Sequence, residues 1–193
     1  MLPENIIWIG VFVNLIGLFM YIKGIIHGNT KPNLVSWFFW MLAPFIAVFL
    51  KLKAGAGLSV LPVFMAGFGP LLVIILSIFM RNLYWKINTL DVIYGMFAFF
   101  ALVLYILTRN LGISIFFAIL SDGLAAIPTL VKSWKFPETE NGITYMTFIF
   151  SNILSLLIIT NWTFSIYSFS IYLLVMNSML VFSIYRKKIF RIT

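Results

Sequence analysis

The chain contains no cysteine, one histidine and only five acidic residues among its 193 positions. The absence of cysteine excludes disulfides, iron–sulfur clusters and thiol chemistry. The single histidine, His27, lies in a short polar segment, and no His/Asp/Glu cluster has the spacing of a metal site, so we expect neither a metal nor a cofactor. Charged residues make up 9% of the chain and hydrophobic residues 63%, which leaves too little charge for a soluble surface. The composition therefore predicts an integral membrane protein.

Long apolar runs are abundant. A helix needs about 20 apolar residues to cross the hydrocarbon core of a bilayer, and helices are the element that satisfies its own backbone in lipid. Seven runs meet this length approximately, and short polar breaks separate them. The sequence predicts an all-α integral membrane protein with seven transmembrane helices. The runs are residues 6–22, 34–50, 58–80, 90–107, 111–131, 143–159 and 164–185.

Lys and Arg residues are distributed unevenly between the two ends of these predicted helices. Ten fall on the side of the C-terminus, whereas only Lys51, Lys53 and Arg109 fall on the other side. Basic residues favour the cytoplasmic side of a membrane. We therefore expect an outside N-terminus and a cytoplasmic C-terminus. This orientation, with contacts to lipid headgroups, explains the net charge of +8 without a nucleic-acid partner.

A shift of 108 residues superimposes the first three runs on the last three. Asn14 then meets Asp122, Trp37 meets Tyr145, and Trp40 meets Phe148. The fourth run is left as a connector, and it restores the orientation that a second set of three helices would otherwise invert. The prediction is a 3+1+3 arrangement of two parallel triple-helix repeats, at residues 1–83 and 111–193, joined by residues 84–110. The alternative is a seven-helix bundle with coincidental spacing.

This layout resembles the SWEET and PQ-loop (MtN3-like) transporter superfamily. A proline within the first helix of the second repeat, Pro128, is followed by Lys132 and Ser133 near the cytoplasmic end, as in the family motif. The Pro-Gln pair of that motif is absent, since Pro128 precedes Thr129 and the first repeat has Met20 at the equivalent position. The resemblance implies a divergent bacterial member in the inner (plasma) membrane.

The resemblance also implies a site. In that family a central pocket is lined by aromatic residues of the second helix of each repeat and by asparagine of the third. The motif proline lets its helix bend, which makes Pro128 the candidate hinge. The residues expected to bind the solute are Asn14, Trp37, Trp40, Asp122, Tyr145, Asn152 and Asn177.

Asp122 lies near the middle of its apolar run, where insertion of an aspartate costs about 2.5–3.5 kcal/mol. Such a residue normally faces the bundle interior and marks a pathway or a proton relay. One interpretation is that Asp122 carries a proton and couples transport to it. The other is a neutral side chain that is hydrogen-bonded to Asn14 for structure alone. The asparagines likewise either bind the solute or form interhelical hydrogen bonds, which contribute about 0.6 kcal/mol each.

The leading functional hypothesis is a small-solute transporter that works by alternating access between two three-helix bundles. A sugar or a similar small neutral polar solute suits the aromatic residues, and proton coupling is left open. The alternative is a non-transporting receptor or assembly protein of the same layout. We expect no enzyme, because Asp122 has no His or Glu partner at its depth. Self-association is left open. The segment KFPETENG is either a solvated loop or part of a gate that pairs with Lys132 or Lys135.

Overall fold

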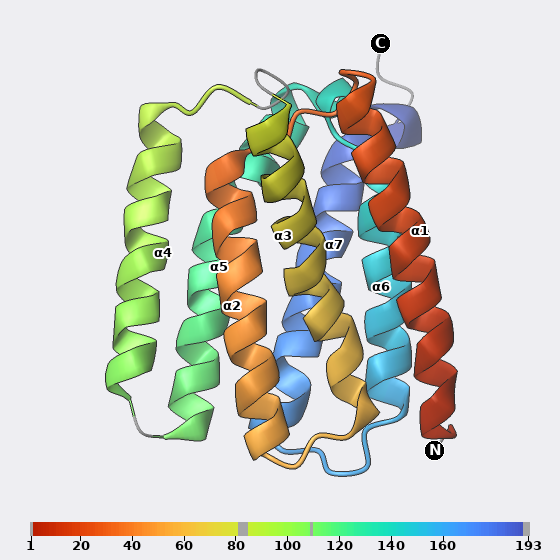
Figure 1. Cartoon of the computed structure of the whole chain (residues 1–193), viewed down its shortest axis with the longest axis vertical. Coiled ribbons are helices and arrows are strands. Elements are labelled where there is room, and N and C mark those ends of the chain that lie inside the picture. The colour runs from red at the N-terminus through yellow and green to blue at the C-terminus, as the bar shows by residue number, and fades with distance from the viewer. Residues whose placement is uncertain (1, 81–84, 109, 191–193) are drawn as a thin grey trace.

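The computed structural model describes residues 2–80, 85–108 and 110–190, and in them the chain forms seven long α-helices that run side by side (Figure 1). The prediction of an all-α fold with seven helices is confirmed. Short 3-10 turns precede three of the helices. The helices are α1 Ile7–Ile26, α2 Leu34–Lys53, α3 Leu61–Phe79, α4 Thr89–Leu107, α5 Leu111–Lys135, α6 Gly142–Leu157 and α7 Phe164–Phe190.

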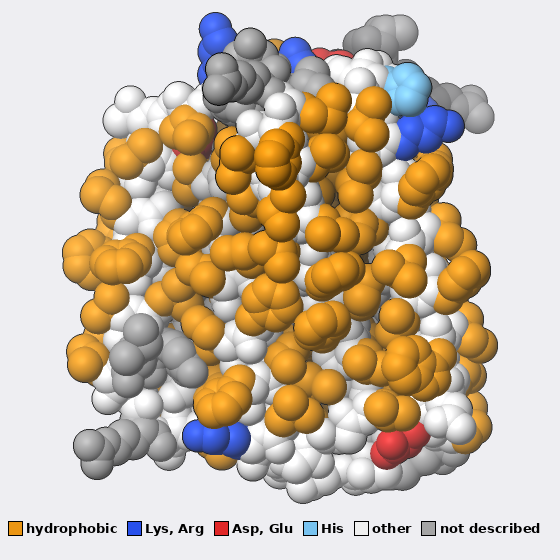
Figure 2. All heavy atoms as spheres, in the orientation of Figure 1, with side chains coloured by type: hydrophobic (Ala, Val, Ile, Leu, Met, Phe, Trp, Pro, Cys, Tyr) orange, Lys and Arg blue, Asp and Glu red, His pale blue; other side chains and the backbone are white. Residues whose placement is uncertain are grey.

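The outer surface is apolar between the two ends of the molecule. Helices α1, α2, α3, α5 and α7, taken with their adjoining 3-10 turns, are long and apolar enough to cross a membrane, and α4 and α6 are shorter apolar helices. Figure 2 shows hydrophobic side chains over most of one face, with Lys and Arg side chains gathered near its ends. This distribution indicates an integral membrane protein, because a surface of this kind is stable only against lipid.

Asparagine begins three of the helices. The Oδ1 atom of Asn33 accepts from the backbone N–H groups of Val35 (3.1 Å) and Ser36 (3.3 Å) at the start of α2. Asn110 and Asn141 cap α5 and α6 in the same way. The first N–H groups of a helix have no partner within it, and an Asn side chain is among the best substitutes. These caps explain why the helices begin where the polar breaks end.

Helices α1, α2, α5 and α7 extend beyond the predicted apolar runs, by three to five residues at their C-terminal ends. The added turns carry basic side chains in each case. Lysine and arginine are good helix formers, and their charge is favourable at a helix C-terminus. These four runs, judged by apolarity alone, were therefore too short, whereas the run 143–159 was too long, because α6 ends at Leu157.

One of these extensions corrects the placement of Lys51, which the sequence assigned to a polar break. Helix α2 ends at Lys53, and Gly55, which has a φ of 86°, lies two residues beyond that end. The N–H of Ala56 bonds to the carbonyl of Lys51 at 2.9 Å, which closes the helix with the left-handed glycine that such ends favour. Lys51 is thus a helical residue, and its side chain is fully buried.

Helix α4 lies outside the other six helices. Helix α3 packs against both α1 and α2, and α7 packs against both α5 and α6. Helix α1 also packs closely against α6, and α2 against α5. Helix α4 packs mainly on α5 and lies at the edge of the molecule in Figure 1. All helices except α4 therefore face a common centre.

The loops alternate between the two ends of the molecule. The α1–α2, α3–α4 and α5–α6 connections lie at the same end as the C-terminus, and the N-terminus lies at the other (Figure 1). Three of the basic residues that were counted for orientation, Arg81, Arg109 and Arg191, lie outside the described residues, as does the boundary predicted between residues 83 and 84.

Candidate functional site

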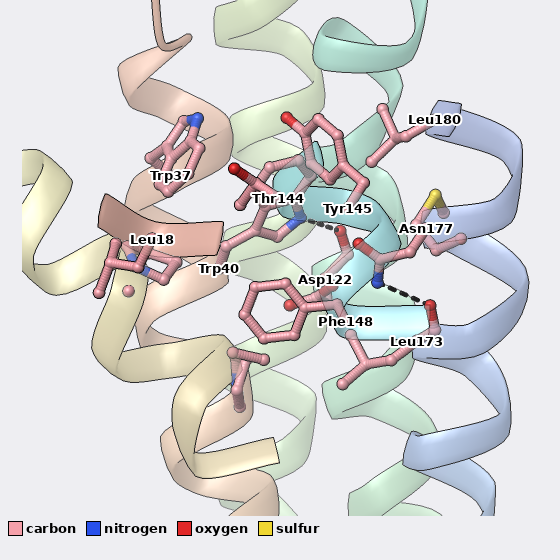
Figure 3. Close-up of a pocket in the computed structure, with 15 residues that line it drawn as sticks. Leu18, Trp37, Trp40, Asp122, Thr144, Tyr145, Phe148, Leu173, Asn177 and Leu180 are labelled. Carbon is pink, nitrogen blue, oxygen red and sulfur yellow. Dashed lines mark hydrogen bonds between the residues drawn. The ribbon is translucent and has the colours of Figure 1, made fainter. Parts of the chain in front are cut away.

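A buried cavity lies at the common centre of the six helices that pack around it. Each of α1, α2, α3, α5, α6 and α7 contributes side chains to its wall (Figure 3). Its volume is about 50 Å³. Since one water needs about 10–15 Å³ of such space, a handful of waters would fill it. The cavity has to enlarge before it can hold a sugar-sized molecule.

One wall of the cavity is a run of aromatic rings. Trp37 and Trp40 lie one turn apart on α2, with ring centroids 5.7 Å apart. The ring of Tyr21 on α1 lies 4.5 Å from that of Trp37. Tyr145 and Phe148 of α6 also line the cavity and lie close to Trp40 in Figure 3. These rings bring together aromatic residues from both predicted repeats.

Of the two indole N–H groups on α2, only one has a hydrogen-bond partner among the described residues. Trp40 Nε1 donates to the backbone carbonyl of Asp122 at 3.3 Å. Trp37 Nε1 is buried and makes no hydrogen bond within the described part of the chain. A buried donor without a partner is costly. In Figure 3 the Trp37 nitrogen points away from Asp122 and Asn177, so this free donor is not directed at the middle of the cavity.

Asp122 lines the cavity from α5, beside Trp40 and Phe148 in Figure 3. Its Oδ2 atom accepts from the hydroxyl of Tyr172 on α7 at 2.7 Å. Its Oδ1 atom is buried and has no hydrogen-bond partner among the described residues. The carboxyl group thus has one fixed partner and one free oxygen. Nothing in the sequence pointed to Tyr172, because its repeat position in the first set is a phenylalanine, Phe64.

The three asparagines take different places. Asn177 lines the cavity, and its Nδ2 atom donates to the Leu173 carbonyl of its own helix at 2.7 Å. Asn14 lies instead in the α1–α6 interface, where Nδ2 donates to Ser151 Oγ at 2.8 Å. Asn152 donates to the Phe148 carbonyl at 2.9 Å and is not part of the cavity wall. Only Asn177 of the three is brought to the site.

The second interpretation of Asp122, a structural hydrogen bond to Asn14, is wrong, because both side chains have other partners. Asn14 finds a hydroxyl on the neighbouring helix α6, namely Ser151. The residue 108 positions before Ser151 is Ala43, so the corresponding place on α2 offers Asp122 no polar group. The carboxyl group reaches Tyr172 instead.

Pro128 is buried within α5 and does not line the cavity. Two other prolines inside helices do line it, Pro44 of α2 and Pro70 of α3. A proline in a helix interior removes a backbone hydrogen bond and allows a bend. The cavity wall therefore contains two positions at which a helix can bend, and the family motif indicated neither of them.

The KFPETENG loop is not wholly solvated. Glu140 is buried and forms an ion pair with the buried side chain of Lys132. The hydroxyls of Tyr21 and Tyr145 both donate to Glu140 Oε2, at 3.1 and 2.8 Å. Of the two interpretations of this loop, the structure has the salt bridge, between Lys132 and Glu140. Glu138 of the same loop is exposed.

A second buried cation lies toward the other end of the helices. The Nζ atom of Lys51 donates to Ser170 Oγ on α7 at 2.9 Å. Ser170 Oγ lies 3.3 Å from Ser155 Oγ, which donates to the Ser59 carbonyl. This cluster could not be predicted from the sequence, because three serines far apart in the chain form no pattern.

Within the described residues, no group of three or more His, Asp or Glu side chains lies close enough together to hold a metal ion. Comparison of the chain with protein-family models, with curated proteins and with solved structures finds no match. The chemistry of the site is therefore argued from its own residues.

Proposed function

We propose that this protein is a small-solute transporter of the SWEET and PQ-loop architecture, which binds a neutral polar solute in the central cavity. The observation that carries the proposal is a set of three residue pairs, each 108 positions apart, in which both members line the same cavity. The pairs are Trp37 with Tyr145, Trp40 with Phe148, and Gly69 with Asn177.

The packing of the helices supports two parallel repeats. The α1–α6 and α5–α2 interfaces exchange when the first three helices are exchanged with the last three. The same exchange also relates α3, which packs against α1 and α2, to α7, which packs against α5 and α6. A two-fold axis normal to the membrane produces both correspondences, and a cavity on that axis is the place where parallel-repeat transporters bind their solute.

Small residues at equivalent positions support the same relation. On α1, Gly10 approaches Ser151 so closely that an added Cβ would lie 3.1 Å from the serine Cβ. The equivalent of Gly10 on α5 is Ala118, which packs in one cluster with Ala47 of α2. Close helix approach through small residues is a common way for membrane helices to associate. Both interfaces between the helix sets use it.

The chemistry of the cavity favours a neutral, hydroxyl-bearing solute. Aromatic faces provide apolar contact area, and a few polar groups fix orientation. Asp122 has a free carboxyl oxygen, and Asn177 adds an amide group to the wall. With its carboxyl group able to gain or lose a proton, Asp122 is also our candidate for proton coupling. Tyr172 is the titratable group in hydrogen-bond contact with it.

The orientation that accompanies this proposal has the N-terminus outside and the C-terminus in the cytoplasm of a bacterial plasma membrane. Lys23, Lys31, Lys86, Lys132 and Lys135 belong to the loop end that also carries the basic C-terminal turn. Lys51, buried in α2, is no longer a loop charge at the opposite end. Its removal from the count sharpens the asymmetry on which the orientation rests.

Uptake by purified protein in liposomes tests the proposal. A panel of radiolabelled sugars and other neutral polar solutes would be offered with and without a pH gradient. We expect uptake of at least one solute, loss of most of it in Trp40→Ala, and loss of the gradient response in Asp122→Asn. Trp8→Phe is the matched control, since Trp8 is exposed on the outer face of α1. Solute binding without net uptake would instead favour a receptor. The absence of both binding and uptake would refute the proposal.

A further inference from the structure

A second, polar cavity lies at the loop end of the helices. It measures about 380 Å³, and its wall includes Lys23, His27, Asn29, Glu138 and Glu140. The first four of these side chains are exposed, whereas Glu140 is buried. We call this space the vestibule. It is open to water at its rim and ends inward at Glu140.

A thin partition separates the vestibule from the central cavity. Glu140 lines the vestibule, and Tyr145 lines the central cavity. The Tyr145 hydroxyl donates to Glu140 Oε2 at 2.8 Å, and the Tyr21 hydroxyl donates to the same atom at 3.1 Å. One carboxylate oxygen therefore holds together the side chains that stand between the two spaces.

The partition ties one set of helices to the other. Tyr21 belongs to α1, whereas Lys132, Glu140 and Tyr145 belong to the segment from α5 to α6. Lys132 Nζ also donates to the backbone carbonyl of Lys31, in the α1–α2 loop. The N–H of Lys31 donates to the Thr139 carbonyl at 3.1 Å. If the two sets rock apart at this end, these contacts have to break together.

The charges of Lys132 and Glu140 can be stabilised in two ways, by each other or by water. In the closed state Lys132 and Glu140 are buried, paired and hydrogen-bonded, which is the condition under which buried charges are tolerated. In an open state the adjoining vestibule would supply water to both charges. An element that is satisfied in either of two arrangements is suited to switching between them.

We propose that Lys132 and Glu140, with the hydroxyls of Tyr21 and Tyr145, form the gate between the central cavity and the vestibule, through which a polar solute passes. This rests on the proposed function only in its last clause, since the opening of the partition can be measured without any solute.

Cysteine accessibility tests the gate directly, because the chain contains no cysteine. Ala66→Cys places one thiol on the wall of the central cavity. A charged, membrane-impermeant methanethiosulfonate reagent would be added to either face of oriented vesicles and the labelling rate measured. The gate is opened by Glu140→Gln with Lys132→Met, and separately by Tyr21→Phe with Tyr145→Phe, which removes only two hydroxyls. Glu138→Gln is the control for the acidic substitution, because it makes the same Glu-to-Gln change at an exposed position of the same loop.

We expect labelling from the vestibule side to accelerate about tenfold or more in both gate variants, the change that loss of one charge-assisted hydrogen bond produces. Labelling from the opposite side and in Glu138→Gln should stay at the parent rate. An unchanged rate in the gate variants, or an equal rise from both sides, would overturn the proposal. Faster labelling from the vestibule side in a protein that takes up no solute would keep the gate and remove the transport function.

Discussion

Replacing Lys51 by methionine is expected to stabilise the protein. The Lys51 side chain is fully buried, and its ammonium group makes one hydrogen bond, to Ser170 Oγ at 2.9 Å. An ammonium has three hydrogens to donate, and no carboxylate lies within 4.0 Å of this one in the described part of the chain. A buried charge without a partner of opposite sign costs several kcal/mol, and one hydrogen bond to a neutral hydroxyl recovers only a part of that.

Methionine keeps an unbranched side chain of similar length and removes the charge. Replacement of buried charges by apolar groups of similar volume stabilises proteins by about 1–4 kcal/mol in favourable cases. Ser170 retains a partner, since its Oγ atom lies 3.3 Å from Ser155 Oγ. In a chain of about 150–250 residues, each kcal/mol raises the melting temperature by about 2–4 °C. We therefore expect a rise of several degrees in Lys51→Met.

Thermal unfolding in detergent, followed by circular dichroism and by the monodisperse fraction on size exclusion, measures this change. Lys53→Met is the control on the same helix, because Lys53 is exposed and its charge lies over the ring of Phe49. That control should move the melting temperature by less than about 2 °C. A fall in Lys51→Met as large as that in Lys51→Ala would refute the reasoning, because it would mean that the ammonium group itself stabilises the fold.

Two further substitutions test the interior of the bundle. Gly17→Val places a side chain where Thr147 of α6 already lies, and we expect it to destabilise the protein by about 1–3 kcal/mol in the same unfolding assay. Thr147→Ala in that background should restore most of the loss, and a failure to do so would show that the α1–α6 contact is not the cause. Tyr172→Phe removes the donor to Asp122 Oδ2, and a double-mutant cycle with Asp122→Ala, which removes the acceptor, should give an interaction of about 1.5–3 kcal/mol. Additive effects would contradict the hydrogen bond.

Local features of the sequence were sufficient to predict most of the fold. The seven apolar runs became the seven helices, and the polar breaks became the loops. The errors were at C-terminal ends, where basic residues extend a helix past its apolar part. The aromatic residues of α2 and α6 were expected at a site because of the family resemblance, and Trp37, Trp40 and Tyr145 do line one cavity.

The partners of the buried polar side chains could not be predicted in the same way. Asn14 was expected opposite Asp122 but bonds to Ser151, and Asp122 bonds to Tyr172. Asn152 turns back to its own helix. In each case the side chain is buried, but the direction in which it points could not be predicted from the sequence.

The sequence by itself determined that this is a helical membrane protein, because length and apolarity of a run depend on neighbouring residues alone. Only the tertiary structure decided that Lys132 meets Glu140, that Lys51 is buried beside Ser170, and that the aromatic rings enclose one cavity. The physical reason is that helices which are apolar on all sides carry little information about their rotation. That rotation is set by close contacts such as Gly17 against Thr147, which exist only once distant segments have packed.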